Sequence, residues 1–385
     1  MPARPLLKKI VIATHYHIYG APQALKDYLI DNRVKQLIFI AHPLRTDGSK
    51  SYVEHIVDGD IKGKRVSLIR TNISFFNYFL EMILSFKWVY SKRGKLNLWI
   101  GVDPLNAFLG VILKKTNRVE KVIFYTIDYV PFRFNNKILN NLYHWMDRFC
   151  LKNADETWNV SPRIAEGRET IRGLRQSVYN RQKVVPIGVW FDRVKKLPFD
   201  KIKKHQLFFL GSLLEKQGVQ LVLDAIPEII KRIPDFHFLI VGGGNYEGVL
   251  REKVERLNLE KYVTFTGWIK DRDKLDQIMS ESALAIAMYD REKDNVTYFA
   301  DPTKLKDYSS AGLPVLLTDV PHNAKELQER RCGFIIEYDK EKIANAVISF
   351  MKDQKILKEY RENAVNYAKQ FDWKIIFDSN LEKIL

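Results

Sequence analysis

The sequence has 385 residues, which is more than one ordinary hydrophobic core contains and suits two domains of about two hundred residues each. Hydrophobic residues make up 46% and charged residues 28%, as in ordinary globular proteins. Its two cysteines, Cys150 and Cys332, lie far apart and lack CxxC spacing, which argues against a disulfide framework or a structural zinc site. A reducing, cytoplasmic location is therefore expected.

The net charge of +16 is distributed unevenly along the chain. Residues 1–190 contain 30 Lys and Arg against 15 Asp and Glu, whereas residues 191–385 contain 32 against 31. The first half should therefore be attracted to an anionic partner, such as a membrane leaflet, a polyanionic glycan or a nucleic acid. The alternative is that these basic residues are simply solvated and have no specific anionic partner.

The first half alternates short β-rich runs with amphipathic segments. Strands are expected at Lys9–Thr14, Leu37–Ala41, Arg65–Arg70, Asn97–Val102, Lys121–Thr126, Glu156–Val160 and Lys183–Pro186. Helices are expected at Pro22–Leu29, Pro104–Lys115 and Asn136–Leu151. This alternation predicts a parallel sheet with helices on both faces.

An aromatic-rich stretch, Ile73–Tyr90, is the most apolar part of the chain. Glu81 and Lys87 interrupt it, and a spanning helix needs about 20 predominantly apolar residues, so it is a poor membrane span. Basic residues follow it at Lys92, Arg93 and Lys95. Two interpretations remain open: a helix lying in a membrane interface, or a helix whose aromatic residues pack in the core.

The second half repeats the alternation after a lysine-rich segment, Trp190–Lys204, that is the expected linker. Strands are expected at Gln206–Leu210, Phe236–Val241, Val263–Thr266, Ala283–Ala287, Val315–Thr318 and Phe334–Glu337. Helices are expected at Gly218–Arg232, Tyr246–Leu257, Lys274–Ser280 and Lys304–Ala311, with three more between Glu341 and Leu385. The fold class is therefore α/β, with two Rossmann-like, doubly wound domains whose strand ends face a cleft.

The segment Ala300–Thr318, ADPTKLKDYSSAGLPVLLT, is the most informative motif. A helix that begins near Thr303 and Lys304 can present backbone N–H groups and an ammonium to phosphates. The segment resembles the PxKLxEYxAxGxPV region of the retaining glycosyltransferase family 4, which has the GT-B fold. The resemblance implies that Asp307, where Glu is usual, binds the ribose of a donor nucleotide.

Other family signatures are present in altered form. The family's second acid, eight positions before the first, is replaced by Phe299, and Asp301 is the nearest carboxylate. The phosphate-binding GRLxxxKG turn resembles Gly211–Gly218, with Ser212 in place of Arg and the lysine one position early, at Lys216. We expect Lys216 to contact the diphosphate; a merely solvated lysine is the alternative.

Four further residues complete the expected site. Gly243, in the turn Gly242–Gly244, and Ile269, in a stretch that resembles the family's GxV, are expected at the donor nucleotide. Gly20 remains from the family's glycine loop near the donor phosphate, beside His15 and His17. Asp128 stands where relatives have a histidine that contacts the donor sugar; it could instead cap the following turn.

The resemblance also implies the domain arrangement and the reaction. Residues 1–190 would bind the acceptor, residues 191–370 would bind the nucleotide sugar, and a helix in 371–385 would cross back to the first domain. The expected activity is hexosyl transfer with retention from a nucleotide diphosphate sugar to a lipid-linked or cell-envelope glycan. In that reaction Asp128, Asp301 and Lys216 are the candidate catalytic residues.

No metal, cofactor or nucleic-acid partner is expected, and the protein could sit at the inner face of the cell membrane. Two alternatives stay open. One is a sugar-nucleotide epimerase, for which no set of catalytic carboxylates and histidine can be assembled. The other is an inactive homologue that binds a nucleotide sugar or nucleic acid, which is favoured by Phe299 in place of an acid and by Ser212.

Overall fold

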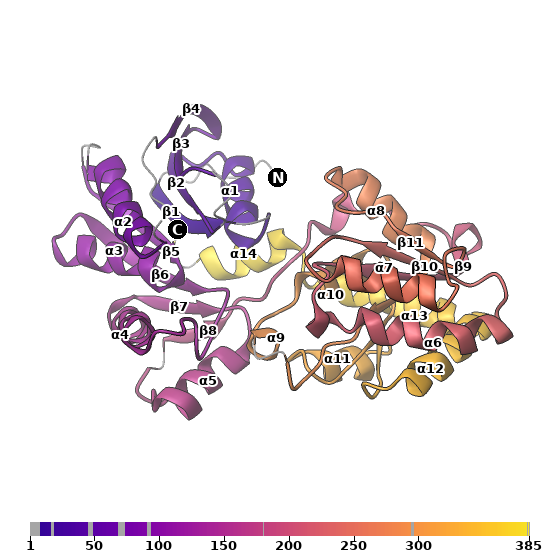
Figure 1. Ribbon diagram of the computed structural model, residues 1–385. Helices are drawn as coiled ribbons and strands as arrows, with labels where there is room; N and C mark the ends of the chain where they lie inside the picture. The colour runs from indigo at the N-terminus through magenta and orange to yellow at the C-terminus, as the bar shows by residue number, and fades with distance from the viewer. Residues whose placement is uncertain are drawn as a thin grey trace. The chain divides into compact units, whose positions relative to one another are not determined.

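The computed structural model describes residues 8–16, 19–44, 49–67, 74–90, 94–179, 181–293, 296–382 and 384. The chain forms two compact units (Figure 1). The first comprises Met1–Pro186 with Ile376–Leu385, and the second comprises Ile187–Ile375.

The first unit is built on a sheet that has eight strands among the described residues. In chain order they are β1 (Lys9–Tyr16), β2 (Gln36–Pro43), β3 (Tyr52–Val57), β4 (Asp60–Val66), β5 (Leu96–Val102), β6 (Val119–Thr126), β7 (Glu156–Asn159) and β8 (Gln182–Val184). The order in the sheet is β4-β3-β2-β1-β5-β6-β7-β8, and all pairs outside the β2–β3–β4 edge are parallel.

Helices pack on this sheet because it is apolar on both faces, as in a doubly wound fold. They are α1 (Ala21–Asp31), α2 (Ser74–Tyr90), α3 (Asp103–Lys115), α4 (Lys137–Asn153), α5 (Pro162–Arg172) and, from the end of the chain, α14 (Trp373–Leu381). The Tyr28 hydroxyl donates to Asp378 at 2.5 Å, and the Tyr28 ring contacts Phe377. The end of the chain thus packs on α1.

A β-hairpin at the sheet edge differs from the sequence-based expectation. Strand β4 covers Asp60–Val66, so the strand expected at Arg65–Arg70 is confirmed only at Arg65 and Val66. Ser67 lies outside the strand, and residues 68–70 lie outside the described part of the chain. The hairpin turns at Asp58 and Gly59, whose φ angles are 53° and 84°. Two consecutive positive φ angles are typical of the Asp-Gly turn that joins antiparallel strands.

The second unit contains a parallel sheet with six strands among the described residues. They are β9 (Lys203–Leu210), β10 (His237–Val241), β11 (Val263–Phe265), β12 (Ser282–Ala287), β13 (Val315–Leu317) and β14 (Gly333–Ile335), in the order β11-β10-β9-β12-β13-β14. From β9 the chain moves outward to one edge, and from β12 to the other. The topological switch point, where such sheets bind ligands, is therefore at β9.

The helices of the second unit cover both faces of its sheet (Figure 1). They are α6 (Val219–Arg232), α7 (Glu247–Arg256), α8 (Arg272–Glu281), α9 (Val296–Phe299), α10 (Thr303–Ser310), α11 (Ala324–Glu329), α12 (Lys340–Lys352) and α13 (Gln354–Lys369). Residues 190–204, expected as a linker, belong to this unit, with Val194 and Ile202 buried in its core. The prediction of two Rossmann-like, doubly wound domains is confirmed.

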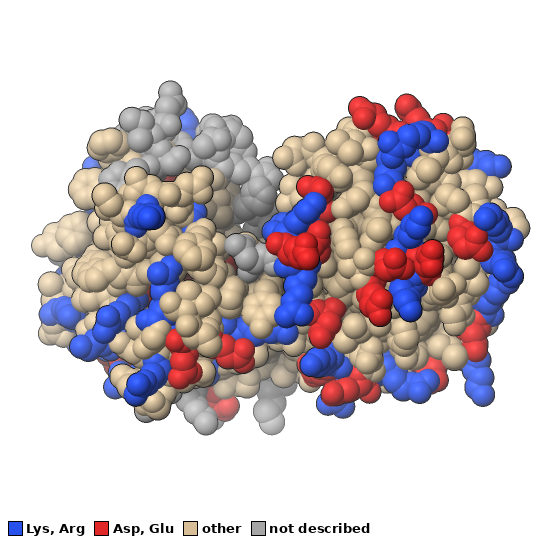
Figure 2. Space-filling model, turned by 60° about the horizontal axis from the view of Figure 1, so that its bottom comes forward, with Lys and Arg blue, Asp and Glu red and all other residues tan. Residues whose placement is uncertain are grey.

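The surface charge differs between the two units. On the face in Figure 2, Lys and Arg outnumber Asp and Glu over the first unit, whereas both kinds alternate over the second.

Helix α2 covers most of the aromatic-rich stretch, but Lys92 and Arg93 lie outside the described residues. Among the helices that the structure describes, none has the length and apolar character needed to cross a membrane.

Candidate active site

Three glycine turns meet at the carboxyl edge of the second sheet. The Gly211 N–H donates to Val241 O at 3.0 Å, and the Gly242 N–H donates to Gly267 O at 3.0 Å. A Cβ added to Gly242 would lie 1.9 Å from Gly211 O, so the two turns pack backbone against backbone. Glycine is required at position 242, and its φ of 132° adds to that requirement.

Gly243 and Ile269 lie at the same edge. A Cβ on Gly243 would come within 3.0 Å of the Trp268 indole nitrogen, and the Trp268 side chain is 54% exposed. Ile269 packs against the core of the unit through a half-buried side chain. An exposed aromatic ring beside a glycine turn offers a flat apolar surface that a nucleobase can stack on.

Lys304 connects α10 with the turn after β9. Its ammonium donates to Gln217 Oε1 at 2.7 Å and lies 4.4 Å from the centre of the Phe209 ring. Lys216 precedes Gln217 in a 3-10 turn, η3 (Glu215–Gln217), so the Lys304 ammonium reaches the turn to which Lys216 belongs. Thr303, also expected there, is exposed at the start of α10, where Pro302 provides no side-chain cap.

Asp307 lies one turn further along α10 and is 6% exposed. Its Oδ1 is 2.6 Å from Arg272 Nη2, and Arg272 Nε is 2.8 Å from Asp276 Oδ1. Burial alone would lower the pKa of Arg272, but the two carboxylates hold it above its ordinary value. Asp307 is therefore held at a fixed place by a permanently charged partner.

Sequence analysis missed Arg272, although a signal was present. It is the first residue of α8, directly after the N-cap residue Asp271. A cation at a helix N-terminus opposes the helix dipole, which indicates that another partner holds it there. Asp307 and Asp276 are those partners.

Asp301 is enclosed rather than open to a ligand pocket. Its side chain is fully buried, forms an ion pair with Lys306, accepts from the Ile187 N–H at 2.9 Å and has His322 Nε2 at 3.3 Å. Burial alone would raise the pKa of Asp301, but Lys306 and His322 hold it below its ordinary value. The structure thus places Asp301 in an internal ion-pair cluster, and its part in catalysis stays a prediction.

The first unit places Asp128 at the carboxyl edge of its own sheet. Asp128 is exposed after β6, and Asp103 follows the neighbouring strand β5 with a φ of 70°. Burial alone would lower the pKa of Arg133, but nearby tyrosines and the carboxylates of Asp103 and Asp128 raise it above its ordinary value. Two carboxylates and one guanidinium therefore gather where β5 and β6 end.

Gly20 and His15 flank the end of β1. Gly20 has an extended φ of −154° and precedes α1, so its backbone conformation is open to any residue. The His15 Nδ1 accepts from the Asn106 side chain at 3.0 Å, and its Nε2 lies 3.0 Å from Glu81 Oε2. His15 is thus tied into the fold on both ring nitrogens, and His17 lies outside the described residues.

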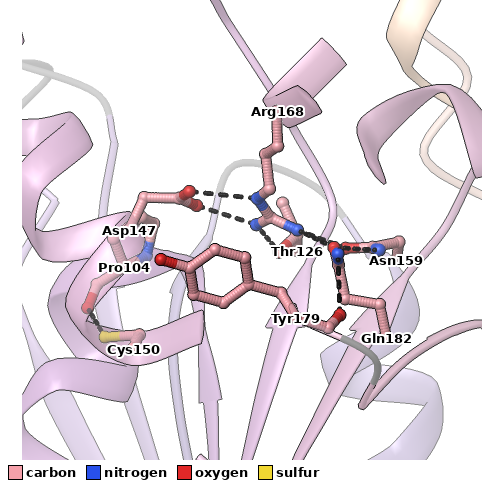
Figure 3. Close-up of polar contacts among 8 residues, drawn as sticks. All are labelled: Pro104, Thr126, Asp147, Cys150, Asn159, Arg168, Tyr179 and Gln182. Carbon is pink, nitrogen blue, oxygen red and sulfur yellow. Dashed lines mark hydrogen bonds and ion pairs between the residues drawn. The ribbon is translucent and has the colours of Figure 1, made fainter. Parts of the chain in front are cut away.

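A buried arginine holds the elements behind this edge together (Figure 3). Arg168 is fully buried on α5 and donates to both carboxylate oxygens of Asp147 on α4, at 3.0 and 2.7 Å. It also donates to Thr126, Asn159 and Gln182, from strands β6, β7 and β8, at 2.7 to 3.0 Å. All three guanidinium nitrogens of Arg168 donate hydrogen bonds within the fold. Arg168 is therefore a structural residue that positions β6 and α4.

The described residues contain no group of three or more His, Cys, Asp or Glu side chains placed to hold a metal ion. The charged residues at the carboxyl edge of the second unit include Lys216, Lys304, Arg272 and Asp307.

Comparison with known proteins agrees with this geometry. Residues 204–353 match the family model of the glycosyl transferases group 1. The chain is 22% identical over 198 residues to a phosphatidyl-myo-inositol mannosyltransferase of Mycobacterium leprae, which covers 50% of each chain. It is 20% identical over 380 residues to a poly(glycerol-phosphate) alpha-glucosyltransferase of Bacillus subtilis, which covers 94% of this chain and 50% of the relative.

The chain thus spans about half the length of the curated relatives that it matches. Among solved structures, Anabaena HepE in complex with UDP-glucose is similar over 98% of this chain and 99% of its own, with a TM-score of 0.72 and 15% identity. That likeness concerns the fold, which is GT-B, as the sequence predicted. Residues 204–353, which lie within the second unit, are thus similar to the glycosyl transferases group 1 family.

Proposed function

We propose that the protein is a glycosyltransferase that moves a hexosyl group from a nucleoside diphosphate sugar to a lipid-linked or cell-envelope glycan, with retention at the anomeric carbon. The observation that carries this proposal is the group formed by Lys216, Lys304 and Asp307 at the switch point of the second sheet. These residues supply two cations for a diphosphate and one carboxylate for a ribose.

The donor would lie across the carboxyl edge of the second unit. Asp307 would accept hydrogen bonds from the ribose hydroxyls, and Trp268 beside Gly243 would support the base. Lys216 and Lys304 would meet the diphosphate with the N–H groups at the start of α10, where Thr303 is exposed. Anabaena HepE, which shares the fold, was solved with UDP-glucose.

In the proposed reaction, the bond between the anomeric carbon and the diphosphate oxygen breaks as an acceptor hydroxyl attacks from the same face. The hydroxyl proton leaves with the diphosphate, so a separate protein base is not needed. Negative charge grows on the diphosphate in this step, and the two lysines stabilise it there. Asp128 would hold a hydroxyl of the sugar or of the acceptor.

The acceptor would bind to the first unit. The first 190 residues carry the surplus of positive charge, and the names of the M. leprae and B. subtilis relatives point to acceptors that contain phosphate. A phosphate-containing acceptor and an anionic membrane surface would both be attracted to such a unit. We therefore place the protein in the cytoplasm, at the inner face of the membrane.

A donor screen tests the proposal. Thermal shift with UDP-, GDP-, ADP- and dTDP-sugars should reveal one nucleotide that stabilises the protein, and the anomer of the product, read by NMR, should match that of the donor. Inversion of the anomer would remove the retaining mechanism. Binding without turnover would favour the inactive homologue, for which Ser212 and Phe299 are the motivating departures.

A further inference from the structure

The first unit contains an apolar groove between α2 and α4, above the start of α3. Its apolar walls include six large side chains: Phe79, Met82, Phe108, Leu142, Trp145 and Met146. Its volume is about 270 Å³, slightly below the roughly 300–1,000 Å³ of typical ligand pockets. A groove of this size and lining suits a single hydrocarbon chain.

One end of the groove is polar. Asp103 and Arg133 line it there, and Arg133 is the only Lys or Arg among the described lining residues. His15 also lines the groove, but the Asn106 side chain donates a hydrogen bond to His15 Nδ1. The ring proton of His15 is therefore on Nε2, which donates a hydrogen bond to Glu81. The permanent positive charge of the lining is therefore that of Arg133.

The helices that wall the groove also present apolar side chains to solvent. Exposed residues recur on α2 at helical spacing, at Phe76, Phe79, Ile83, Phe86 and Tyr90. A shorter exposed row on α4 consists of Ile138, Leu142 and Trp145. Because Phe79, Leu142 and Trp145 belong to both the rows and the groove, the groove opens into an exposed apolar surface.

We propose that this groove holds the hydrocarbon chain of one phosphate-containing lipid acceptor, and that Arg133 binds its phosphate. The proposal deepens the function proposed above and rests on it. A guanidinium binds phosphate through paired N–H donors, whereas the carboxylates of Asp103 and Asp128 can only accept hydrogen bonds. This mixed set fits a phosphate that is followed by hydroxyl groups, as in a lipid with a glycerol or sugar headgroup.

Three soluble probes below their micelle concentrations separate the parts of such a lipid. Decanoyl-lysophosphatidylglycerol has chain, phosphate and hydroxyls; monodecanoylglycerol lacks the phosphate; glycerol phosphate lacks the chain. The first should bind saturably and shift the emission of Trp145, a change that Trp145→Phe removes. Monodecanoylglycerol and glycerol phosphate should each bind more weakly, by a factor of about ten or more. Equal binding of the first two probes would overturn the role of Arg133.

Variants with matched controls sharpen the test. Arg133→Gln should weaken binding of the lysophospholipid about ten-fold or more and leave binding of monodecanoylglycerol unchanged. Arg148→Gln removes the same charge from an exposed position on α4 and should change neither. If the two variants behave alike, Arg133 is not the phosphate ligand.

A second pair distinguishes the groove from the outer surface. Met82→Lys places a charge in the groove and should abolish binding of the soluble lipid. Ile83→Lys changes the neighbouring exposed residue, outside the groove lining, and should leave that binding intact. Loss of binding in both variants, or in neither, would contradict a chain-binding groove.

Nucleotide-sugar binding, measured on the same samples, separates this proposal from the proposed function. Donor binding without lipid binding would refute the groove and leave the transferase standing. Lipid binding without donor binding would support the groove and refute the transferase.

Discussion

The Arg272 guanidinium lies against the carboxylate of Asp307, with 2.6 Å between Nη2 and Oδ1, although the two residues belong to different helices. This contact fixes the carboxylate before any ligand arrives. An oriented acceptor loses little entropy when it binds hydroxyl groups, which favours ribose recognition at Asp307.

The first prediction concerns this carboxylate. Asp307→Ala should weaken nucleotide binding by about 1.5–3 kcal/mol, the value of a charge-assisted hydrogen bond. Thermal stability should change less, because Arg272 keeps Asp276 as a partner. Calorimetric titration measures the loss, with Asp273→Ala, an exposed carboxylate on α8, as the control. Unchanged affinity in Asp307→Ala would remove the ribose assignment.

The two lysines should act on the rate. Lys216→Ala and Lys304→Ala should each lower kcat by about 10²–10³-fold, because their charge matters most as the diphosphate leaves. Melting temperatures should stay close to that of the unchanged protein. Lys270→Ala, at an exposed position of the same unit, is the matched control. A lysine whose removal leaves the rate near normal is a solvated surface residue.

Arg168 should matter for folding. Arg168→Met leaves Asp147 buried without its partner, so the free energy of unfolding should fall by about 3–5 kcal/mol. Urea denaturation followed by circular dichroism measures this change. The control Arg175→Met, at an exposed position, should lower the free energy of unfolding by less than about 0.5 kcal/mol. A similar midpoint for both variants would mean that the buried network contributes little.

The membrane proposal predicts salt-sensitive docking. Each basic residue near an anionic surface contributes on the order of 1 kcal/mol, so Lys92/Arg93/Lys95→Glu should strongly reduce co-sedimentation with anionic vesicles. Added salt should weaken the binding of the unchanged protein. The same reversal at Lys355, Lys358 and Lys369, exposed on α13, should have little effect. No binding to anionic vesicles at low salt would end the membrane proposal.

The fold of the second unit was largely predictable because its local sequence patterns agree with the strands and turns that form there. Short runs such as QLFFL and FHFLIV are continuous and apolar, as strands buried on both faces require, and β9 and β10 form there. Glycines after these runs gave the turns at Gly211 and Gly242. The positions of Lys216, Lys304 and Asp307 at one edge then followed from the alternation of strands and helices.

The first unit was less predictable, for two physical reasons. The β3–β4 hairpin was missed although Asp58-Gly59 is a two-residue turn signal, because β4 is exposed along its whole length and has no buried apolar pattern. The groove could not be predicted either. Its residues come from three helices, and only the fold brings Phe79, Phe108 and Trp145 together.

Helix α2 is buried on one face and exposed on the other, and its contact with a membrane interface stays a prediction. Val89 and Ser85 are buried against the unit, whereas Phe79 and Phe86 are exposed. A helix with aromatic residues on two faces cannot be assigned to core or surface from composition alone, because the partner of each face is set by tertiary packing.

Transfer of label from a nucleotide sugar to lipid is the most direct test of glycosyl transfer by this protein. The purified protein is incubated with radiolabelled nucleotide sugars and a membrane lipid extract, and the organic phase is counted. We expect label from one donor to move into the lipid fraction, and we expect Lys304→Ala to slow this transfer greatly. Label that stays on the nucleotide with every donor, or that appears only as a changed sugar on the nucleotide, would contradict the assignment as a glycosyltransferase.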